Sequence, residues 1–404
     1  MGSNLDTVPM SGIIRIRDMM YGVANPFRLD QGDVSFDAPG PVKDGMTRAI
    51  ADNRSHYLQT TGVPRLLDLV TAKLRAVNGL PVASPDEVMI TNGGIHGLYL
   101  VWQALLEPGD EVIVPDPEWP PACGTVMAAR GVPVRCRLRQ PLGWRFDLHE
   151  MASLVTPRTR AIYLNSPNNP TGGVLTRGDL EAVAALAAQR DLWVVSDEAY
   201  EDVVFDGEHV SIGSLPGMYE RTLSIFTFSK SFAMTGIRVG YLATPDTRLR
   251  DRLRKVLFLT TSNVCSVAQY GGIAGLEAPR EVIDRFRLEL RARRDIFYRG
   301  LESLGGVLTG EPPAGAFYAF ARLAPDWKAR AVLPATADGG GGGEGEGGSP
   351  SWQMTDYLIR HGRVGCVPGV DFGPAGEGHI RFCFARERAE LEGAIVSMRS
   401  LFRA

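Results

Sequence analysis

Residues 227–242 read TFSKSFAMTGIRVGYL and place one lysine among small and hydroxyl-bearing residues, with an arginine eight positions later. A lysine that acts as a covalent nucleophile needs a partly deprotonated amine, which burial or a neighbouring cation provides. Lys230 is therefore a candidate nucleophile. Thr227 and Ser229 add hydroxyl groups beside it, and the planar guanidinium of Arg238 suits a phosphate group.

A carboxylate ends a second apolar run. In VVSDEAYEDVVF (194–205), Asp197 follows the apolar residues and Tyr200 lies three positions later. A carboxylate at a buried strand end needs a cationic partner, because otherwise it takes up a proton. An ion pair or a helix cap would explain Asp197 if the motif stood alone. The protonated ring nitrogen of a cofactor would serve equally well.

Three further motifs place amide, backbone or aromatic groups after predicted strands. YLNSPNNPTGGVL (163–175) presents Asn169 on a turn, although its prolines and glycines alone also suit an ordinary connection. NGGIHG (92–97) starts a helix whose first backbone amides can bind a phosphate. Trp119, in PDPEWPP, can lie flat against a planar ring or belong to the core. One ligand satisfies these motifs together: pyridoxal 5'-phosphate (PLP), a planar phosphorylated aldehyde whose ring nitrogen must stay protonated.

These motifs follow short β-rich runs that alternate with helical stretches. The strands are expected at 87–91, 111–115, 160–165, 192–197 and 222–226. A helix is expected at 177–190, between two of them. Strands separated by helix-length segments indicate βαβ units, so we expect an α/β fold with a mostly parallel sheet flanked by helices. Ligands bind beyond the C-terminal ends of such strands, which is where the motifs fall.

The pattern changes after about residue 275, where a smaller α+β domain is expected. A charged helix at 280–305 precedes three β-rich runs, at 315–323, 363–368 and 379–385.

We expect three parts of the chain to form two domains. Residues 1–45 are assigned to the small domain, residues 46–278 to a large PLP-binding domain, and residues 279–404 to the rest of the small domain. Within the last part, the glycine-rich stretch at 338–350 has too few apolar side chains to pack and is expected to be a flexible loop without a catalytic role.

Composition narrows the classes of function. The chain has 404 residues, a formal net charge of -3 and 44% hydrophobic residues, which indicates a globular protein and gives no sign of nucleic acid or an anionic membrane as partner. Its five cysteines are widely spaced without a CxxC pair, which argues against a disulfide framework and a structural zinc site, and no metal is expected. The N-terminus shows no signal-peptide pattern and no apolar run is long enough to span a bilayer, so we expect a cytoplasmic protein.

Taken together, the motifs resemble those of the class I/II aminotransferases, the fold-type I PLP enzymes of the aspartate aminotransferase group. NSPNNPTGG, SDEAYEDVVF, TFSKSFAMTGIRVGYL and PAGAFYAF occur in the order and spacing of that family. The resemblance extends from LDQGDVSF (29–36) to HIRFCFA (379–385), which is nearly the whole chain.

The resemblance implies a role for each matching residue. Lys230 would form the internal aldimine with PLP and also move the proton of the substrate α-carbon. Asp197 would pair with the pyridinium nitrogen, while Tyr200 and Asn169 would hydrogen-bond the phenolic oxygen of the ring. Trp119 would stack on the ring. The phosphate would be held by Gly93, Gly94, Ile95, Thr227, Ser229 and Arg238.

Three other residues extend the site implied by the resemblance. Tyr57 matches a tyrosine that reaches the phosphate from the neighbouring subunit, so a homodimer with shared active sites is implied. Arg381, assisted by Asn169, matches the arginine that binds the substrate α-carboxylate through two parallel hydrogen bonds. Gly32, in LDQGDVSF, is expected to contact the substrate.

The implied activity is a transaminase that moves an amino group between an L-amino acid and a 2-oxo acid by ping-pong kinetics. A C–S lyase, a decarboxylase or a ring-forming synthase of the same fold shares these motifs and stays open. A PLP-sensing transcription regulator would need a DNA-binding domain ahead of the fold, and only about 45 residues precede the predicted large domain. The amino donor is not fixed by the motifs. Segments 11–16 and 260–272 are expected to border the pocket for its side chain, and His96 is expected to pack its helix rather than reach the cofactor.

Overall fold

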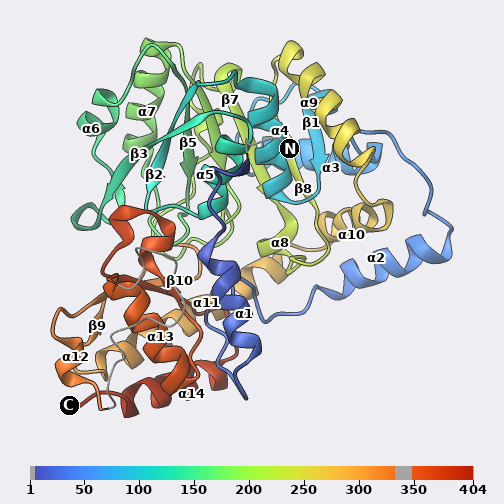
Figure 1. Cartoon of the computed structure of the whole chain (residues 1–404). Helices are drawn as coiled ribbons and strands as arrows, with labels where there is room; N and C mark the ends of the chain where they lie inside the picture. Colours follow the sequence, from blue (N-terminus) through green and yellow to red (C-terminus); the bar gives the residue numbers. More distant parts are fainter. Residues whose placement is uncertain (1–4, 333–347, 404) are drawn as a thin grey trace.

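The structure is a computed structural model that describes residues 5–332 and 348–403. The predicted flexible loop at 338–350 therefore lies outside the described residues except for its last three positions. Two sheets organise the chain, and helices cover both faces of the larger one (Figure 1). The α/β fold with a large, mostly parallel sheet is confirmed.

The larger sheet has eight strands in the order β1-β8-β7-β6-β5-β2-β3-β4. The central pairs β7/β6, β6/β5, β5/β2 and β2/β3 are parallel, and the pairs at the edges are antiparallel. The strand bounds are β1 Val88–Thr91, β2 Glu111–Asp116, β3 Val132–Arg139, β4 Arg145–Phe146, β5 Thr159–Asn165, β6 Trp193–Asp197, β7 Thr222–Thr227 and β8 Gly240–Ala243.

Both faces of this sheet are buried, because alternate residues of each strand point to opposite sides. On β5, Ala161 and Tyr163 belong to one apolar cluster, whereas Ile162 and Leu164 belong to another. The first cluster also includes side chains from the helices α4 Gly94–Leu105, α5 Pro120–Ala128 and α9 Thr247–Thr261. The second includes side chains from α6 Leu148–Ser153 and α7 Arg177–Arg190. A third contains α2 Gly40–Ala51, α3 Pro64–Ala76 and α10 Ser266–Glu277.

The smaller sheet is antiparallel, with the strand order β11-β12-β10-β9. Its elements are β9 Leu308–Thr309, β10 Tyr318–Leu323, β11 Val367–Pro368 and β12 His379–Cys383, with α11 Glu281–Glu302, α12 Trp327–Arg330, α13 Pro350–Gly362, α14 Arg388–Ser400 and the short helices η6 Gly369–Phe372 and η7 Pro374–Gly376. Within the chain part described, no helix is long and apolar enough to cross a membrane.

The strand predicted at 363–368 is mostly wrong, since only its last two residues form β11. Arg363 instead ends α13 in the left-handed conformation, at φ 56°. Val364 then makes an isolated bridge with Phe27 of the N-terminal segment. Residues 363–366 form the end of α13 and the connection that follows it. A short apolar run in such a connection has the same pattern of residue types as a short strand.

The N-terminal segment joins both parts of the molecule. Ile16 and Met20 of α1 Gly12–Tyr21 pack against Trp352 and Ile359 of α13. Farther along, the backbone of Leu29 accepts a hydrogen bond from Cys383 N. α2 then packs against α10 beside the larger sheet (Figure 1). The domain boundaries at residues 45 and 278 stay a prediction.

Candidate active site

A cavity of about 330 Å³ opens at the C-terminal ends of the central parallel strands, and residues of both sheets line it. Every residue predicted for the site lines it except Gly93 and Tyr57. Ile13, Asn165, Ala199 and Tyr318 also line it, although the sequence did not single them out as site residues. Ile13 lies in the segment 11–16, which we expected at the side-chain end, whereas no residue of 260–272 lines this cavity.

Lys230 lies on α8 Phe228–Ser231, a one-turn helix that starts where β7 ends. The Thr227 side chain caps this helix by accepting a hydrogen bond from Ser229 N at 3.2 Å. The amine Nζ of Lys230 donates to the carbonyl oxygen of Gly32 at 2.7 Å. Burial lowers the pKa of Lys230 to about 8, and the charge of Asp33 only partly opposes this. The amine is therefore close to the protonation state that a nucleophile or base needs.

Asp197 is the last residue of β6 and is 4% exposed. Its carboxylate accepts hydrogen bonds from the Tyr163 hydroxyl at 3.1 Å and from Ala199 N at 3.1 Å. Among the described residues, no cationic side chain forms an ion pair with it. Burial raises the pKa of Asp197 to about 6. The ion-pair alternative is thus not observed, and a cation placed in the cavity would stabilise the charged carboxylate.

Arg238 and the start of α4 form a cradle at one end of the cavity. Gly93 has a φ of 77°, and a Cβ atom there would meet Arg238 Nη2 at 2.2 Å, so the close approach requires glycine. Arg238 Nη1 donates to Thr235 O at 2.7 Å, which fixes the guanidinium. Thr227 donates to Ser229 Oγ at 2.8 Å, and this leaves the Ser229 hydroxyl hydrogen able to reach a ligand. Helix-start amides, a hydroxyl and a guanidinium together favour a phosphate.

His96 does not line the cavity beside this cradle. Its Nδ1 accepts a hydrogen bond from Asn92 N at 3.1 Å, and its Nε2 lies 2.9 Å from the Thr260 hydroxyl on α9. Because it does not line the cavity, its observed role is to join the start of α4 to the end of α9.

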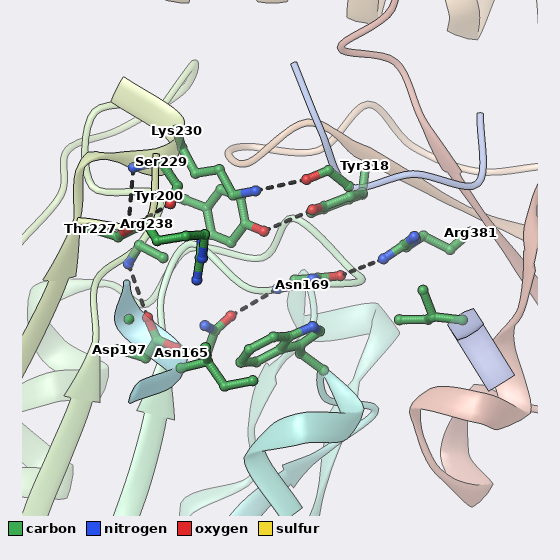
Figure 2. A pocket seen from close by; sticks show the side chains of 16 residues that line it. Asn165, Asn169, Asp197, Tyr200, Thr227, Ser229, Lys230, Arg238, Tyr318 and Arg381 are labelled. Atoms are coloured by element: carbon green, nitrogen blue, oxygen red, sulfur yellow. Dashed lines mark hydrogen bonds between the residues drawn. The ribbon is translucent and has the colours of Figure 1, made fainter. Parts of the chain in front are cut away.

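Arg381 lies opposite the lysine, on β12, and is 1% exposed (Figure 2). Its guanidinium donates to Asn169 Oδ1 at 3.2 Å and to the Asp30 carbonyl at 2.6 Å. The guanidinium carbon also lies 4.7 Å from the centre of the Tyr318 ring and 5.0 Å from that of Phe372. Arg381 Nε is buried and has no partner within the described parts of the chain. This arrangement suits a bound carboxylate, which accepts from the guanidinium.

Tyr200 and Asn169 occupy the middle of the cavity (Figure 2). The Tyr200 and Tyr318 hydroxyls lie 2.8 Å apart in a hydrogen bond. Asn169 N donates to Asn165 Oδ1 at 2.9 Å, which holds the turn that carries its side chain. Burial raises the pKa of Tyr200 well above its ordinary value, so its hydroxyl stays protonated and can donate.

Tyr57 lies outside this cavity and is 90% exposed. It borders a separate hollow together with His56, Thr261, Asn263 and Cys265. The segment 260–272 therefore borders Tyr57 rather than the cavity of Lys230.

The chain is similar over most of its length to known proteins. The family model for aminotransferase class I and II matches residues 24–397. The chain belongs to the class I and II aminotransferases. Aromatic-amino-acid aminotransferase 2 of Thermococcus litoralis is 32% identical over 100% of this chain and 98% of the relative. The aspartate/prephenate aminotransferase of Thermus thermophilus is 36% identical, over 91% of this chain and 88% of the relative.

A solved structure of Thermus thermophilus aspartate aminotransferase with maleate superimposes with a TM-score of 0.87, at 32% identity and with 99% of each chain covered. The fold of this aminotransferase is thus fold type I, and its activity is PLP-dependent amino-group transfer. Both the family and the cofactor expected from the sequence are confirmed.

The observed donor set of the aminotransferase fits PLP. Asp197 is a buried carboxylate without a cationic partner in the described part of the chain, which suits a pyridinium nitrogen. The Gly93 backbone approaches Arg238 too closely for any larger residue, as a phosphate cradle requires. Lys230 has a lowered pKa and opens into the same cavity.

Proposed function

We propose that this aminotransferase uses Lys230 both to hold its cofactor and to move a proton at the substrate α-carbon. The lowered pKa of Lys230 and its opening into the cavity that also contains Arg381 carry this proposal. Bound PLP supplies an electron sink for the negative charge that develops at the α-carbon. A lysine with a pKa of about 8 can accept and return that proton near neutral pH.

The remaining polar residues bind and orient. Arg381 and Asn169 would hold the substrate α-carboxylate, because they are joined at 3.2 Å and their other contacts fix their orientation. Asp197 would keep the ring nitrogen of the cofactor protonated, and Tyr200 would donate to the phenolic oxygen. Trp119 would stack on the ring. The product of the first amino acid leaves before the 2-oxo acid binds, so ping-pong kinetics are expected.

The phosphate group of the cofactor would lie in the cradle at the start of α4. Backbone amides and side chains of the predicted set contribute there, namely Gly93, Gly94, Ile95, Thr227, Ser229 and Arg238. Gly32 would contribute its carbonyl oxygen next to the reacting atoms, since this oxygen already accepts from Lys230.

We also propose a homodimer in which Tyr57 completes the site of the partner. Tyr57 is 90% exposed, and on the neighbouring helix α9 Leu259 is 80% exposed and Phe258 58%. A second copy that covers this surface would bury all three side chains. We place the enzyme in the cytoplasm, where its free thiols, including the exposed Cys265, persist.

The amino donor is proposed to carry an uncharged, apolar side chain. Three cations line the cavity in the described chain, Lys230, Arg238 and Arg381, and each already has a role. At the remaining wall, Ile13 packs against an apolar cluster that contains Phe372. A second carboxylate placed there would lack a cation from the same chain, which is costly in a buried site.

A half-reaction test separates the donor classes. Loss of the absorption band of the bound cofactor is followed after mixing with single amino acids. Leucine and phenylalanine should react at least about a hundredfold faster than aspartate and glutamate, since an unpaired buried carboxylate costs several kcal/mol. Faster reaction with aspartate would contradict the donor class, and no reaction with any α-amino acid would contradict the proposed chemistry.

A matched pair of variants tests the position of the side-chain pocket. Ile13→Lys adds a cation at the cavity wall and should speed the reaction with aspartate relative to leucine. Ile14→Lys is the control, because Ile14 is on the same helix but is 37% exposed and does not line the cavity. An equal response of the two variants would exclude Ile13 from the pocket.

A further inference from the structure

Glu118 is a buried carboxyl group beside the site that the proposed chemistry does not use. It lies in the turn between β2 and α5 and is 1% exposed. Its Oε1 accepts a hydrogen bond from Trp119 N at 2.8 Å. Its Oε2 accepts from Asn168 Nδ2, also at 2.8 Å. One side chain thus joins the turn that carries Trp119 to the turn that carries Asn169.

The orientation of Asn168 makes this bridge specific. Its Oδ1 accepts from both Thr171 N at 3.2 Å and Thr171 Oγ1 at 2.7 Å. The amide therefore cannot reverse without losing these two bonds, and its Nδ2 has to face Glu118. An acceptor is required at position 118.

The backbone of Glu118 reaches the small sheet as well. Glu118 N donates to the carbonyl oxygen of Phe372 at 2.8 Å. The Phe372 ring lies 5.0 Å from the guanidinium carbon of Arg381. Two residues earlier, at the end of β2, the Asp116 carboxylate accepts a hydrogen bond from Ala375 N at 3.2 Å. The turn before α5 is therefore fixed against the loop that packs on Arg381.

We propose that the Glu118 side chain is a positioning group that holds two loops in register, those of Trp119 and Asn169, on a turn whose backbone is fixed to the loop of Phe372. The inference rests on the proposed roles of Trp119 as the ring-stacking residue and of Asn169 as a ligand of the carboxylate. Burial raises the pKa of Glu118 well above its ordinary value, and the nearby charge of Asp197 adds to this. Burying a carboxyl group without a cation costs folding free energy. Glu118 therefore contributes to the site through the hydrogen bonds that it accepts.

The hydrogen-bond pattern suggests a pair of exchanged substitutions. Glu118→Gln places an NH₂ group against either Asn168 Nδ2 or Trp119 N, so one of the two bonds is lost whichever way the amide turns. Adding Asn168→Asp restores a complementary pattern, because Gln at 118 then donates to the new carboxylate while Thr171 keeps its acceptor. The control is Glu111→Gln, which alters another buried carboxyl group, 5% exposed and paired with Arg158, at the opposite end of β2.

The test uses the PLP-loaded enzyme and two readouts besides activity. Visible circular dichroism of the bound cofactor reports its orientation, and titration with 3-phenylpropionate, an unreactive carboxylate, reports binding at Arg381 and Asn169. Glu118→Gln should reduce the dichroic band and weaken 3-phenylpropionate about tenfold, the usual effect of one lost hydrogen bond with its orphaned partner. The exchanged double variant should regain most of both signals, while Glu111→Gln should match the unmodified enzyme in both.

Two results would overturn the proposal. One is a Glu118→Gln enzyme with an unchanged dichroic band and unchanged carboxylate binding, and the other is a double variant that regains neither. If Glu118→Gln does not fold, Asn168→Ala is the second variant. It removes the hydrogen bond between residues 118 and 168 without placing two N–H donors against each other. It should reduce both the dichroic band and the affinity for 3-phenylpropionate. Absence of a dichroic band or of carboxylate binding in the unmodified enzyme would instead refute the proposed function.

Discussion

At the scale of single residues, the site depends on ionisable groups placed where water is excluded. Burial moves the pKa of Lys230 down to about 8 and the pKa of Asp197 up to about 6. Both shifts disfavour the charged form, so the folded chain alone bears a cost at both positions. A cofactor that bonds the amine and brings a cation to the carboxylate removes both costs at once.

The cost at Asp197 predicts a pH-dependent stability. With a pKa of about 6 in the folded chain and 3.8 ordinarily, the folded state binds the proton more tightly. Its stability therefore falls as pH rises from about 4 to about 6, by at most about 3 kcal/mol. At pH 7, the cofactor-free Asp197→Asn variant should have a higher melting temperature than the cofactor-free unmodified protein. The difference between the two melting temperatures should become smaller towards pH 5.

Melting curves of both cofactor-free proteins between pH 5 and pH 8 check this. Adding PLP should reverse the order, because only the carboxylate pairs with a pyridinium nitrogen. A difference in melting temperature that does not change with pH would mean that other groups stabilise the charge of Asp197.

At the scale of elements, the start of α4 and the strand that follows Arg238 meet without space for a side chain. Gly93→Ala should weaken PLP binding by about tenfold to a hundredfold, because its Cβ would displace Arg238 and strain a backbone with φ 77°. Gly109→Ala is the matched control, since Gly109 also has a positive φ, 89°, but a Cβ there would meet nothing within 4 Å.

Spectroscopic titration of both variants with PLP distinguishes the effect of backbone strain, which both share, from the effect of the contact with Arg238, which only Gly93→Ala creates. The two should lose similar stability, and only Gly93→Ala should lose cofactor affinity. Equal affinities in the two variants would show that the cradle tolerates a displaced Arg238.

Local motifs made most of the site predictable from sequence. Asp197 ends β6 and Lys230 follows the end of the parallel neighbour β7, and that rule alone brings them to one edge of the sheet. Tyr318 escaped prediction because its position depends on a contact between distant segments, the hydrogen bond from Tyr200 to Tyr318. For the same reason no sequence pattern reveals that Glu118 faces Asn168.

At the scale of the whole molecule, the proposed dimer predicts that two defective subunits can restore each other. Lys230→Ala and Tyr57→Ala should each have low activity alone. In a hybrid dimer, one site would combine an intact Lys230 with an intact Tyr57 of the partner subunit. Random mixing should therefore recover about a quarter of the unmodified activity, since about half of the dimers are hybrids with one complete site each.

Activity after unfolding and refolding the two variants together measures this recovery. Refolding each variant alone and then mixing is the control for slow exchange. If Tyr57 serves only its own chain, the mixture will stay at the sum of the two variants, even when gel filtration shows a dimer.

The hydrogen bond from Lys230 to Gly32 gives the N-terminal segment an influence that its place at the chain end conceals. Gly32 lies between α1, which packs on α13, and α2, which packs on α10. Shortening or fusing the chain before residue 40 would leave the eight-stranded sheet complete, yet it would open the lysine amine to water and let its pKa rise. An expression tag that pulls on this segment would thus act as an inhibitor of the active site, in a protein that is folded by every bulk measure.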